Sequence, residues 1–219
     1  MAINTLEKNS ENFIEAKLLK AQSLTKEALH EISQQITAGM TEKEALYITD
    51  STFKLYGFEK YWHAPKIRFG PNTVKTFSET SEPGVILQEN DIYFLDFGPV
   101  FLGHEADFGE TFVVGNNPEL LKLKTTANNL FDQLRKSWKE KKISGIDLYK
   151  MAVEQTEKLG YKFNLDGGSG HRIGDFPHHI HFRGDLAEVD FIPYQNRWIL
   201  EVQIYDAKLN RGAFVEDIL

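Results

Sequence analysis

Hydrophobic positions near the start of the chain recur at the three- and four-residue spacing of an amphipathic helix. The spacing predicts a long helix over roughly residues 11–38. Its apolar face is formed by Ile14, Leu18, Ala21, Ala28, Ile32 and Ile36. Gly39 is expected to end this helix, and Thr41 with Glu44 forms a capping box for a second helix, which should end at Gly57. Two consecutive helices are therefore predicted.

The pattern then changes to that of extended chain. Residues 66–77 look extended, and DIYFLDFGPVF, residues 91–101, is a strong β run. The stretch FLDFGPVFLGHEADFGETFVVG is typical of an apolar hairpin with its turn near residues 101–103. Such a hairpin places Asp96 and Asp107, eleven positions apart, opposite or diagonal to each other on its two arms.

A similar order of elements recurs about a hundred positions later. Asn117 and Pro118 open a third helix as N-cap and first helical residue. Ser144 caps a fourth helix, which ends at Gly160, the same sixteen-position spacing as in the second helix. We interpret residues 1–219 as one α+β domain built from two related halves, each made of two helices followed by strands.

Composition excludes several classes of protein. A net charge of −7 argues against a nucleic-acid partner and against binding to an anionic membrane surface. The chain has no apolar run long enough to span a membrane, and its polar, acidic start lacks the layout of a signal peptide. The absence of cysteine excludes disulfides and thiolate chemistry. A cytoplasmic protein is expected.

Four acidic residues stand within apolar, strand-like runs, and one histidine follows a glycine-rich stretch. They are Asp96, Asp107, Glu201, Glu216 and His171. Taken singly, each acid is typical of a solvated surface group. Converging carboxylates without a cation would repel each other and take up protons. Two divalent ions roughly 3.5–4 Å apart would remove that repulsion and could hold a bridging hydroxide. Oxygen ligands with an imidazole suit Mn(II), Fe(II) or Co(II) better than a structural zinc cage.

These residues resemble those of the pita-bread metallopeptidases, which include methionine aminopeptidase, aminopeptidase P, prolidase and the related creatinase. The resemblance covers residues 11–219 and rests on ITAGMTEKEA, the hairpin stretch, GSGHRIGDFPHH, WILEVQI and AFVEDIL. LDFG and FVED are closest to the aminopeptidase P–prolidase branch. The resemblance implies the pita-bread fold, in which two helix–helix–strand halves surround a curved antiparallel sheet.

The resemblance also implies roles for the five residues. Asp96 would bind one metal ion, Asp107 and Glu216 would bridge both ions, and His171 and Glu201 would bind the second. The two divalent ions would be manganese by preference, with cobalt, iron(II) or zinc as alternatives. Glu201 would in addition carry a proton between the attacking water and the leaving amine.

A further histidine matches the family by spacing. His178, seven positions after His171, would donate a hydrogen bond to the substrate, whereas His179 and His181 are interpreted as structural or supporting groups. The family also has a substrate-contacting histidine at the position of Phe77, and this chain departs from the pattern there. Phe77 is therefore expected to alter the substrate-binding face.

Three functions follow from these observations. The first is an aminopeptidase that removes an N-terminal residue from peptides, with Xaa-Pro peptides favoured. The second is a creatinase-like hydrolase of a C–N bond in a small amide, which the Phe77 departure favours. The third is a binding module that keeps the fold without the chemistry; retention of all five ligand residues argues against it.

Other features have simpler interpretations. His30 on a helix and His63 after Lys60-Tyr61-Trp62 are interpreted as structural residues. The aromatic segment at 56–62 is more typical of packing than of a substrate wall. The aminopeptidase P–prolidase branch has an extra N-terminal domain, which this sequence is expected to lack. A more open site, or a wall supplied by a second subunit in a homodimer, would follow.

Overall fold

The computed structural model describes residues 3–178 and 181–219. Their main sheet has the strand order β2-β3-β6-β10-β9-β7, with β8 paired to β9, and every neighbouring pair is antiparallel. These strands are β2 (Lys66–Phe69), β3 (Asp91–Phe97), β6 (Phe108–Val114), β7 (Lys162–Phe163), β8 (His171–Arg172), β9 (Trp198–Asp206) and β10 (Arg211–Ile218). A smaller sheet has the order β1-β4-β5 and consists of β1 (Lys60–Tyr61), β4 (Pro99–Phe101) and β5 (His104–Glu105).

The first predicted helix is shorter than the expected range 11–38: it begins at Glu15 and ends at Gln35, so Gly39 does not end it. Four α-helices are found among the described residues, in the predicted order. They are α1 (Glu15–Gln35), α2 (Glu42–Tyr56), α3 (Pro118–Lys141) and α4 (Gly145–Lys158). The Thr41–Glu44 capping box forms at the start of α2, and Gly57 ends that helix in the left-handed conformation. The side chains of Asn117 and Ser144 cap α3 and α4. None of the described helices is both long and apolar enough to cross a membrane.

The prediction of extended chain over residues 66–77 is wrong beyond residue 69. Gly70 has a φ of +51°, and Pro71 follows at the start of a 3₁₀-helix that runs over Gly70–Val74. A side chain at position 70 would also collide with the Asp91 carboxylate, because its Cβ would lie 2.7 Å from Oδ2. The glycine and proline together therefore turn the chain out of the strand.

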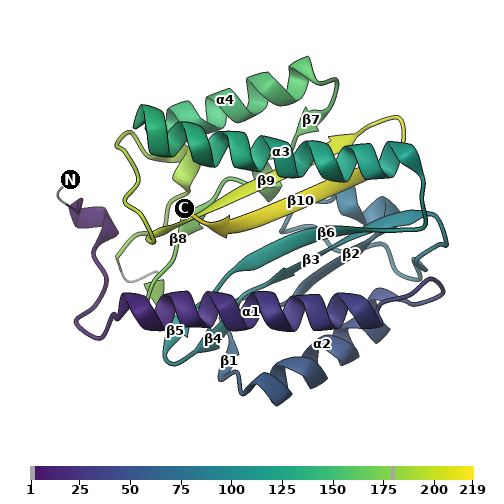
Figure 1. Ribbon diagram of the computed structural model, residues 1–219, viewed down its shortest axis with the longest axis horizontal. Helices are drawn as coiled ribbons and strands as arrows, with labels where there is room; N and C mark the ends of the chain where they lie inside the picture. The colour runs from purple at the N-terminus through teal and green to yellow at the C-terminus, as the bar shows by residue number, and fades with distance from the viewer. Residues whose placement is uncertain (1–2, 179–180) are drawn as a thin grey trace.

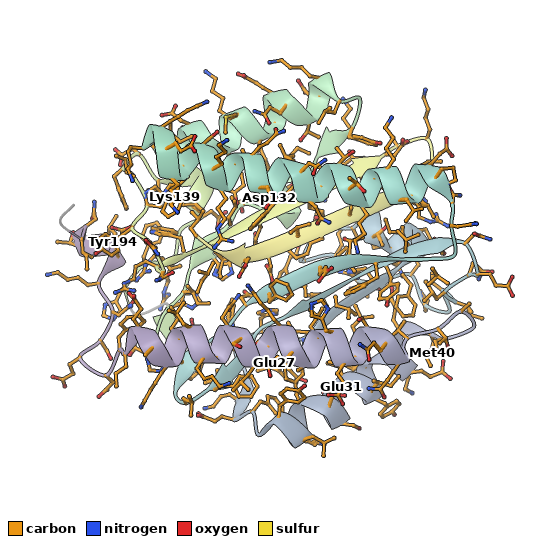
Figure 2. The ribbon with its side chains drawn as sticks, in the orientation of Figure 1. Glu27, Glu31, Met40, Asp132, Lys139 and Tyr194 are labelled. Carbon is orange, nitrogen blue, oxygen red and sulfur yellow. The ribbon has the colours of Figure 1, made fainter. Side chains whose placement is uncertain are left out.

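The two predicted halves meet in the middle of the sheet. Strands β2, β3 and β6 lie with α1 and α2, strands β10, β9 and β7 lie with α3 and α4, and β6 pairs with β10 (Figure 1). Each half has its own hydrophobic cluster beneath its helices. The polar faces of α1 and α3 point outward, as Glu27 and Glu31 of α1 and Asp132 of α3 illustrate (Figure 2). The sequence repeat therefore corresponds to a real repeat of helix–helix–strand units.

Strand alternation decides which side chains face the helices. Leu95 of β3 packs with α1 and α2, and Leu200 of β9 packs with α3 and α4. Because successive side chains of a strand point to opposite faces, the neighbouring residues Asp96 and Glu201 face away from the helices. Acidic residues that look misplaced in apolar runs thus share the face of the sheet that the helices leave free.

Candidate metal centre

One row of directly paired residues crosses five strands of the sheet. Lys66 of β2 pairs with Asp96 of β3, Asp96 with Gly109 of β6, Gly109 with Glu216 of β10, and Glu216 with Glu201 of β9. Directly paired residues of antiparallel strands point to the same face, so these three acids converge there. A Cβ at Gly109 would lie 2.5 Å from the Phe214 ring, and glycine at this position keeps the space between the acids open.

Asp107 and His171 complete the five residues that the sequence singles out. Asp107 lies two residues before Gly109, diagonal to Asp96 on the hairpin, as predicted. His171 lies in β8, and its Nε2 is 2.9 Å from Asp107 Oδ2 and 3.7 Å from Glu201 Oε1. Ligand atoms of Asp107, His171 and Glu216 lie within 4.8 Å of one another. Folding therefore brings together residues that span more than half of the chain.

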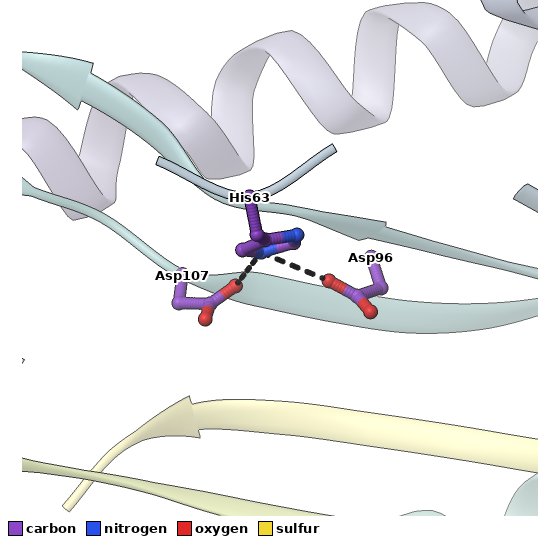
Figure 3. Close-up of side chains that lie close together, drawn as sticks. All are labelled: His63, Asp96 and Asp107. Carbon is purple, nitrogen blue, oxygen red and sulfur yellow. Dashed lines mark hydrogen bonds and ion pairs between the residues drawn. The ribbon is translucent and has the colours of Figure 1, made fainter. Parts of the chain in front are cut away.

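His63 also lies in this cluster, a position that its interpretation as a structural residue did not predict. Its Nε2 is 3.2 Å from Asp107 Oδ1 and 3.5 Å from Asp96 Oδ1 (Figure 3). The ligand atoms of His63, Asp96 and Asp107 form a second group within 4.8 Å. His30, by contrast, is exposed on α1, 3.9 Å from Glu110, as expected of a structural residue.

The local chain explains how His63 reaches the acids. Strand β1 pairs with β4, and the Trp62 backbone N–H donates to the Gly98 carbonyl at 2.9 Å, so His63 lies directly over the end of β3. A Cβ at Gly98 would lie 2.1 Å from the His63 ring. The sequence signal was therefore the glycine of LDFGP, which makes room for an imidazole from a segment more than thirty positions earlier.

Burial and mutual repulsion raise the pKa of the clustered acids. Burial raises the pKa of Asp96 to about 7; His63 opposes the rise and Asp107 adds to it. Burial and the neighbouring carboxylates also raise the pKa of Glu201, although His171 lowers it in part. The same two causes raise the pKa of Glu216 well above its usual range. Without a cation, these acids therefore hold their protons to a higher pH than free carboxyl groups do.

Asp107 keeps its charge because it lies between two imidazoles. Burial raises the pKa of Asp107, but His63 and His171 outweigh this and hold it well below its usual range. Burial lowers the pKa of each histidine, but contacts with Asp107 and other carboxylates raise both values to about 9. In the metal-free protein, imidazolium groups therefore supply part of the positive charge that the acids need.

The donor set suits divalent cations. Oxygen atoms predominate, each group of ligand atoms includes one imidazole, and Asp107 belongs to both groups. The Oε1 atom of Glu216 is buried and has no hydrogen-bond partner among the described residues. A buried carboxylate oxygen without a partner is costly, and a bound cation would satisfy it. The cluster can therefore hold metal ions.

His178 lies beside the cluster, as the sequence predicts, and a buried glutamate holds it. The Glu105 carboxylate accepts a hydrogen bond from the His178 backbone N–H at 3.0 Å and contacts the ring Nδ1. The His178 ring stacks on that of His171 at 5.6 Å, and the Trp62 ring lies 5.0 Å away. Burial raises the pKa of Glu105 to about 8, although the hydrogen bond from the His178 backbone N–H lowers it in part.

Glu105 and Trp62 are therefore residues of the site that the sequence did not single out. Trp62 belongs to the aromatic segment at residues 56–62, for which the sequence favoured a packing role over a place beside the site. Its ring nevertheless lies beside His171 and His178. His181 donates its backbone N–H to the His178 carbonyl at 3.1 Å, and the role of its side chain stays a prediction. His179 lies outside the described residues.

Phe77 lies at the edge of the cluster on the Asp96 side. Its ring is 46% exposed and 5.5 Å from the His63 ring. The Lys66 ammonium lies 4.2 Å from the centre of the Phe77 ring and makes no ion pair within residues 3–178 and 181–219. Phe77 and Lys66 also line a small hollow with Asp96. The residue that departs from the expected histidine thus borders the site.

Known proteins support this interpretation of the site. A family model described as metallopeptidase family M24 matches residues 16–219. The chain belongs to metallopeptidase family M24. A methionine aminopeptidase from Aquifex aeolicus (strain VF5) is 25% identical over 170 residues, which make up 72% of this chain and 65% of that relative. Membership in family M24 agrees with a metal-binding role for the acidic cluster.

Solved structures show the same fold. An X-Pro aminopeptidase from Thermotoga maritima superposes with a TM-score of 0.77 at 22% identity, over 92% of this chain and 56% of that one. A prolidase from Pyrococcus furiosus gives 0.78 at 20% identity, over 98% and 62%. A methionine aminopeptidase from Thermotoga maritima gives 0.75 at 16% identity, over 96% and 93%. The predicted pita-bread fold is confirmed, and the chain spans less than two thirds of the first two proteins.

Proposed function

We propose that this M24 chain is a metal-dependent aminopeptidase that uses two divalent cations, manganese by preference, to remove the N-terminal residue from short peptides. The observation that carries the proposal is the convergence of Asp96, Asp107, Glu201 and Glu216 with two imidazoles on one face of the sheet. Xaa-Pro peptides are the favoured substrates, because solved structures of this fold include an X-Pro aminopeptidase and prolidases.

Each ligand has a place in this proposal. Asp96 would hold one ion, His171 and Glu201 would hold the other, and Asp107 and Glu216 would bind both. Asp107 is suited to bridging because its two oxygens face opposite sides of the cluster, Oδ2 toward His171 and Oδ1 toward His63. When bound, the pair of ions would lower the pKa of water and polarise the scissile carbonyl.

The remaining steps belong to side chains of the protein. Glu201 accepts the proton of the attacking water and passes it to the leaving amine. His178 donates a hydrogen bond to the carbonyl oxygen of the substrate, where negative charge develops. Glu105 fixes the orientation of the His178 ring through its contacts with Nδ1 and the backbone N–H.

Phe77 supports a second candidate, a hydrolase of a C–N bond in a small amide. An exposed aromatic ring with a lysine ammonium above it offers a substrate different contacts from those of an imidazole. A small anionic amide would suit the unpaired Lys66 ammonium, whereas a peptide amine would gain nothing from it. This candidate keeps the same metal ligands and differs only in the substrate.

The test is release of the N-terminal residue from a panel of Xaa-Pro and Met-Xaa peptides by protein loaded with Mn(II) or Co(II). EDTA-treated protein and the Glu201→Gln variant serve as controls, and both should be inactive. Turnover of peptides by the loaded protein supports the aminopeptidase. Turnover of small amides alone, detected by mass spectrometry of a metabolite mixture, would replace it with the second candidate. A protein that binds metal but turns over neither class would contradict both.

A further inference from the structure

We propose that His63 is a metal ligand: its Nε2 binds the ion on the Asp96 side, so that each of the two ions has one imidazole. The inference rests on the pair of ions proposed above and adds a nitrogen ligand to the position otherwise held only by carboxylates. It is carried by three independent features of the described chain: the placement of His63 on Asp107, the orientation of its ring, and the space that Gly98 leaves for it.

His63 and His171 contact the two sides of one carboxylate. His63 Nε2 lies 3.2 Å from Asp107 Oδ1, and His171 Nε2 lies 2.9 Å from Asp107 Oδ2. Each imidazole also has a second acid on its own side, Asp96 at 3.5 Å from His63 and Glu201 at 3.7 Å from His171. If His171 is a ligand of one ion, the same placement makes His63 a ligand of the other.

The ring orientation is the one that a metal ligand needs. His63 Nδ1 lies 3.0 Å from the Ala64 carbonyl oxygen, and His171 Nδ1 lies 2.7 Å from the Arg172 carbonyl oxygen. In both cases the Nδ1–H donates to the carbonyl of the next residue, which turns Nε2 toward the acids. Ligating histidines usually have a backbone carbonyl or carboxylate partner of this kind, which fixes the tautomer.

The distances agree with a shared coordination sphere. Neighbouring ligand atoms about 2.0–2.2 Å from a metal ion lie roughly 2.8–3.1 Å from one another in octahedral geometry and roughly 3.3–3.6 Å in tetrahedral geometry, so roughly 2.8–3.6 Å in all. The separations of 3.2 Å and 3.5 Å from His63 Nε2 to the two aspartates fall within this range. One ligand atom from each of the two aspartates and from His63 lies within 4.8 Å of the others, close enough to bind one ion together, and Figure 3 shows His63 between the two carboxylates.

The surrounding chain is built to hold this ring. Gly98 lacks the Cβ that would lie 2.1 Å from His63 Cδ2 and 2.3 Å from Nε2. The Trp62 indole N–H donates to the Ala106 carbonyl at 3.0 Å, and the Trp62 ring packs edge-on against His63 at 4.4 Å. The hydrogen bond fixes the segment that carries His63 to the hairpin that carries the aspartates, and the ring contact supports the imidazole. A purely structural histidine would not require a glycine beside the acids.

Metal titration of the metal-free protein by calorimetry tests the inference. With Mn(II), the unmodified protein should show two binding events. His63→Ala should weaken one event at least tenfold, the order of loss seen when even outer-shell partners of metal ligands are removed, and leave the other within about twofold. His30→Ala, which removes an exposed imidazole from α1, is the matched control and should leave both events unchanged. Circular dichroism in EDTA checks that each variant is folded.

Gly98→Ala provides a second route to the same result. The added methyl group displaces the His63 ring and leaves all five other ligands, so it should weaken the same event as His63→Ala. His63→Gln, which keeps most of the side-chain volume, should also weaken it if either of the other variants fails to fold. If folded His63→Gln and His63→Ala bind Mn(II) at both sites with affinities within about twofold of the unmodified protein, the inference is overturned. A rise in the KM for peptide without any loss of metal affinity would then assign His63 to substrate binding instead. If the unmodified protein binds no metal, it is the proposed function that fails.

Discussion

Glu201 and Glu216 lie directly opposite each other on strands β9 and β10, in the middle of the sheet. Like charges at directly paired positions of antiparallel strands destabilise the pairing. Both side chains have a raised pKa, for which burial is the first cause. The strands can therefore keep this register in two ways: the carboxylates take up protons, or cations bind between them. The exchange between these two states has consequences for stability, pH dependence and activity.

Glu216→Gln should separate the stability of the fold from the binding of metal. An amide at position 216 removes the repulsion with Glu201, so the melting temperature in EDTA should stay equal to that of the unmodified protein or rise by a few degrees, about 2–4 °C per kcal/mol for a chain of this size. The rise in melting temperature that Mn(II) produces should largely disappear. Differential scanning calorimetry with and without Mn(II) measures both quantities.

Glu110→Gln is the matched control for this prediction. Glu110 lies on the adjacent strand β6, where it is 3.6 Å from Lys124 Nζ and outside both groups of ligand atoms. This variant should keep the full response to Mn(II). A Glu216→Gln protein that responds to Mn(II) as strongly as the control does would show that Glu216 binds no metal.

The metal-free protein should lose stability as the pH rises from about 5 to 9. Asp96 titrates near 3.9 when unfolded and at about 7 when folded, and His63 and His171 titrate near 6.5 and at about 9. A raised folded pKa contributes stability below the unfolded value, and this stability is lost as the pH passes the folded value. Asp107, with a lowered pKa, contributes steadily across this window and loses its contribution only in strong acid.

Metal should reverse this pH dependence, because the ligands must be deprotonated to bind it. Urea denaturation in EDTA and in Mn(II) at pH 5.5, 7 and 8.5 tests both statements. The stabilisation by Mn(II) should grow with pH while the stability of the metal-free protein falls. A metal-free protein that becomes more stable between pH 5.5 and 8.5 would contradict the proposed protonation of the cluster.

Glu105 should act on catalysis only through His178. Glu105→Ala leaves the His178 ring without its Nδ1 partner, so kcat should fall about 10–100-fold, less than the loss of an oxyanion donor itself. Glu105→Gln can still accept from the His178 backbone N–H and can donate its amide N–H to Nδ1, which keeps Nε2–H as the donor. Its kcat should stay within about threefold. Steady-state kinetics on one Xaa-Pro dipeptide, with metal content measured in parallel, distinguishes the variants; an equal loss in both would argue against this orientation role.

Phe77→His tests how the substrate side of the site departs from the family pattern. An imidazole at position 77 would restore a hydrogen-bond donor beside the cluster and remove the aromatic face beneath Lys66. Peptidase kcat/KM should rise while metal affinity stays unchanged. Phe77→Leu, which removes the ring without adding a donor, is the control and should not raise it. Unchanged or lower peptide turnover in Phe77→His would show that this edge of the site serves another substrate.

The sequence predicts most of the fold because its signals are local. The Thr41–Glu44 capping box, the Asn117 cap and Gly57 each act within one helical turn of the position that they define. The same is true of the hairpin, whose turn length sets the diagonal of Asp96 and Asp107. The strand expected at residues 66–77 ends early because Gly70 has a positive φ and Pro71 follows it, a turn signal that the alternation of apolar residues does not encode.

The site could be predicted only as far as the family spacing reaches. The four acids and His171 follow that spacing, whereas His63 lies just after a two-residue strand of a separate small sheet. The position of the His63 ring depends on the absence of a Cβ at Gly98, which is a matter of packing between segments that are distant in the sequence. Glu105 was missed for a similar reason, since its partner His178 lies 73 positions later and no local pattern links them.

The most direct test of the central claim is a crystal of the protein grown with Mn(II), with diffraction measured on both sides of the manganese absorption edge. The account predicts two anomalous peaks roughly 3.5–4 Å apart, the separation of dinuclear sites, on either side of the Asp107 carboxylate. His63 and Asp96 should border one peak, and His171 and Glu201 the other. An anomalous map without density among these residues, from protein shown to be folded and supplied with excess Mn(II), would contradict it.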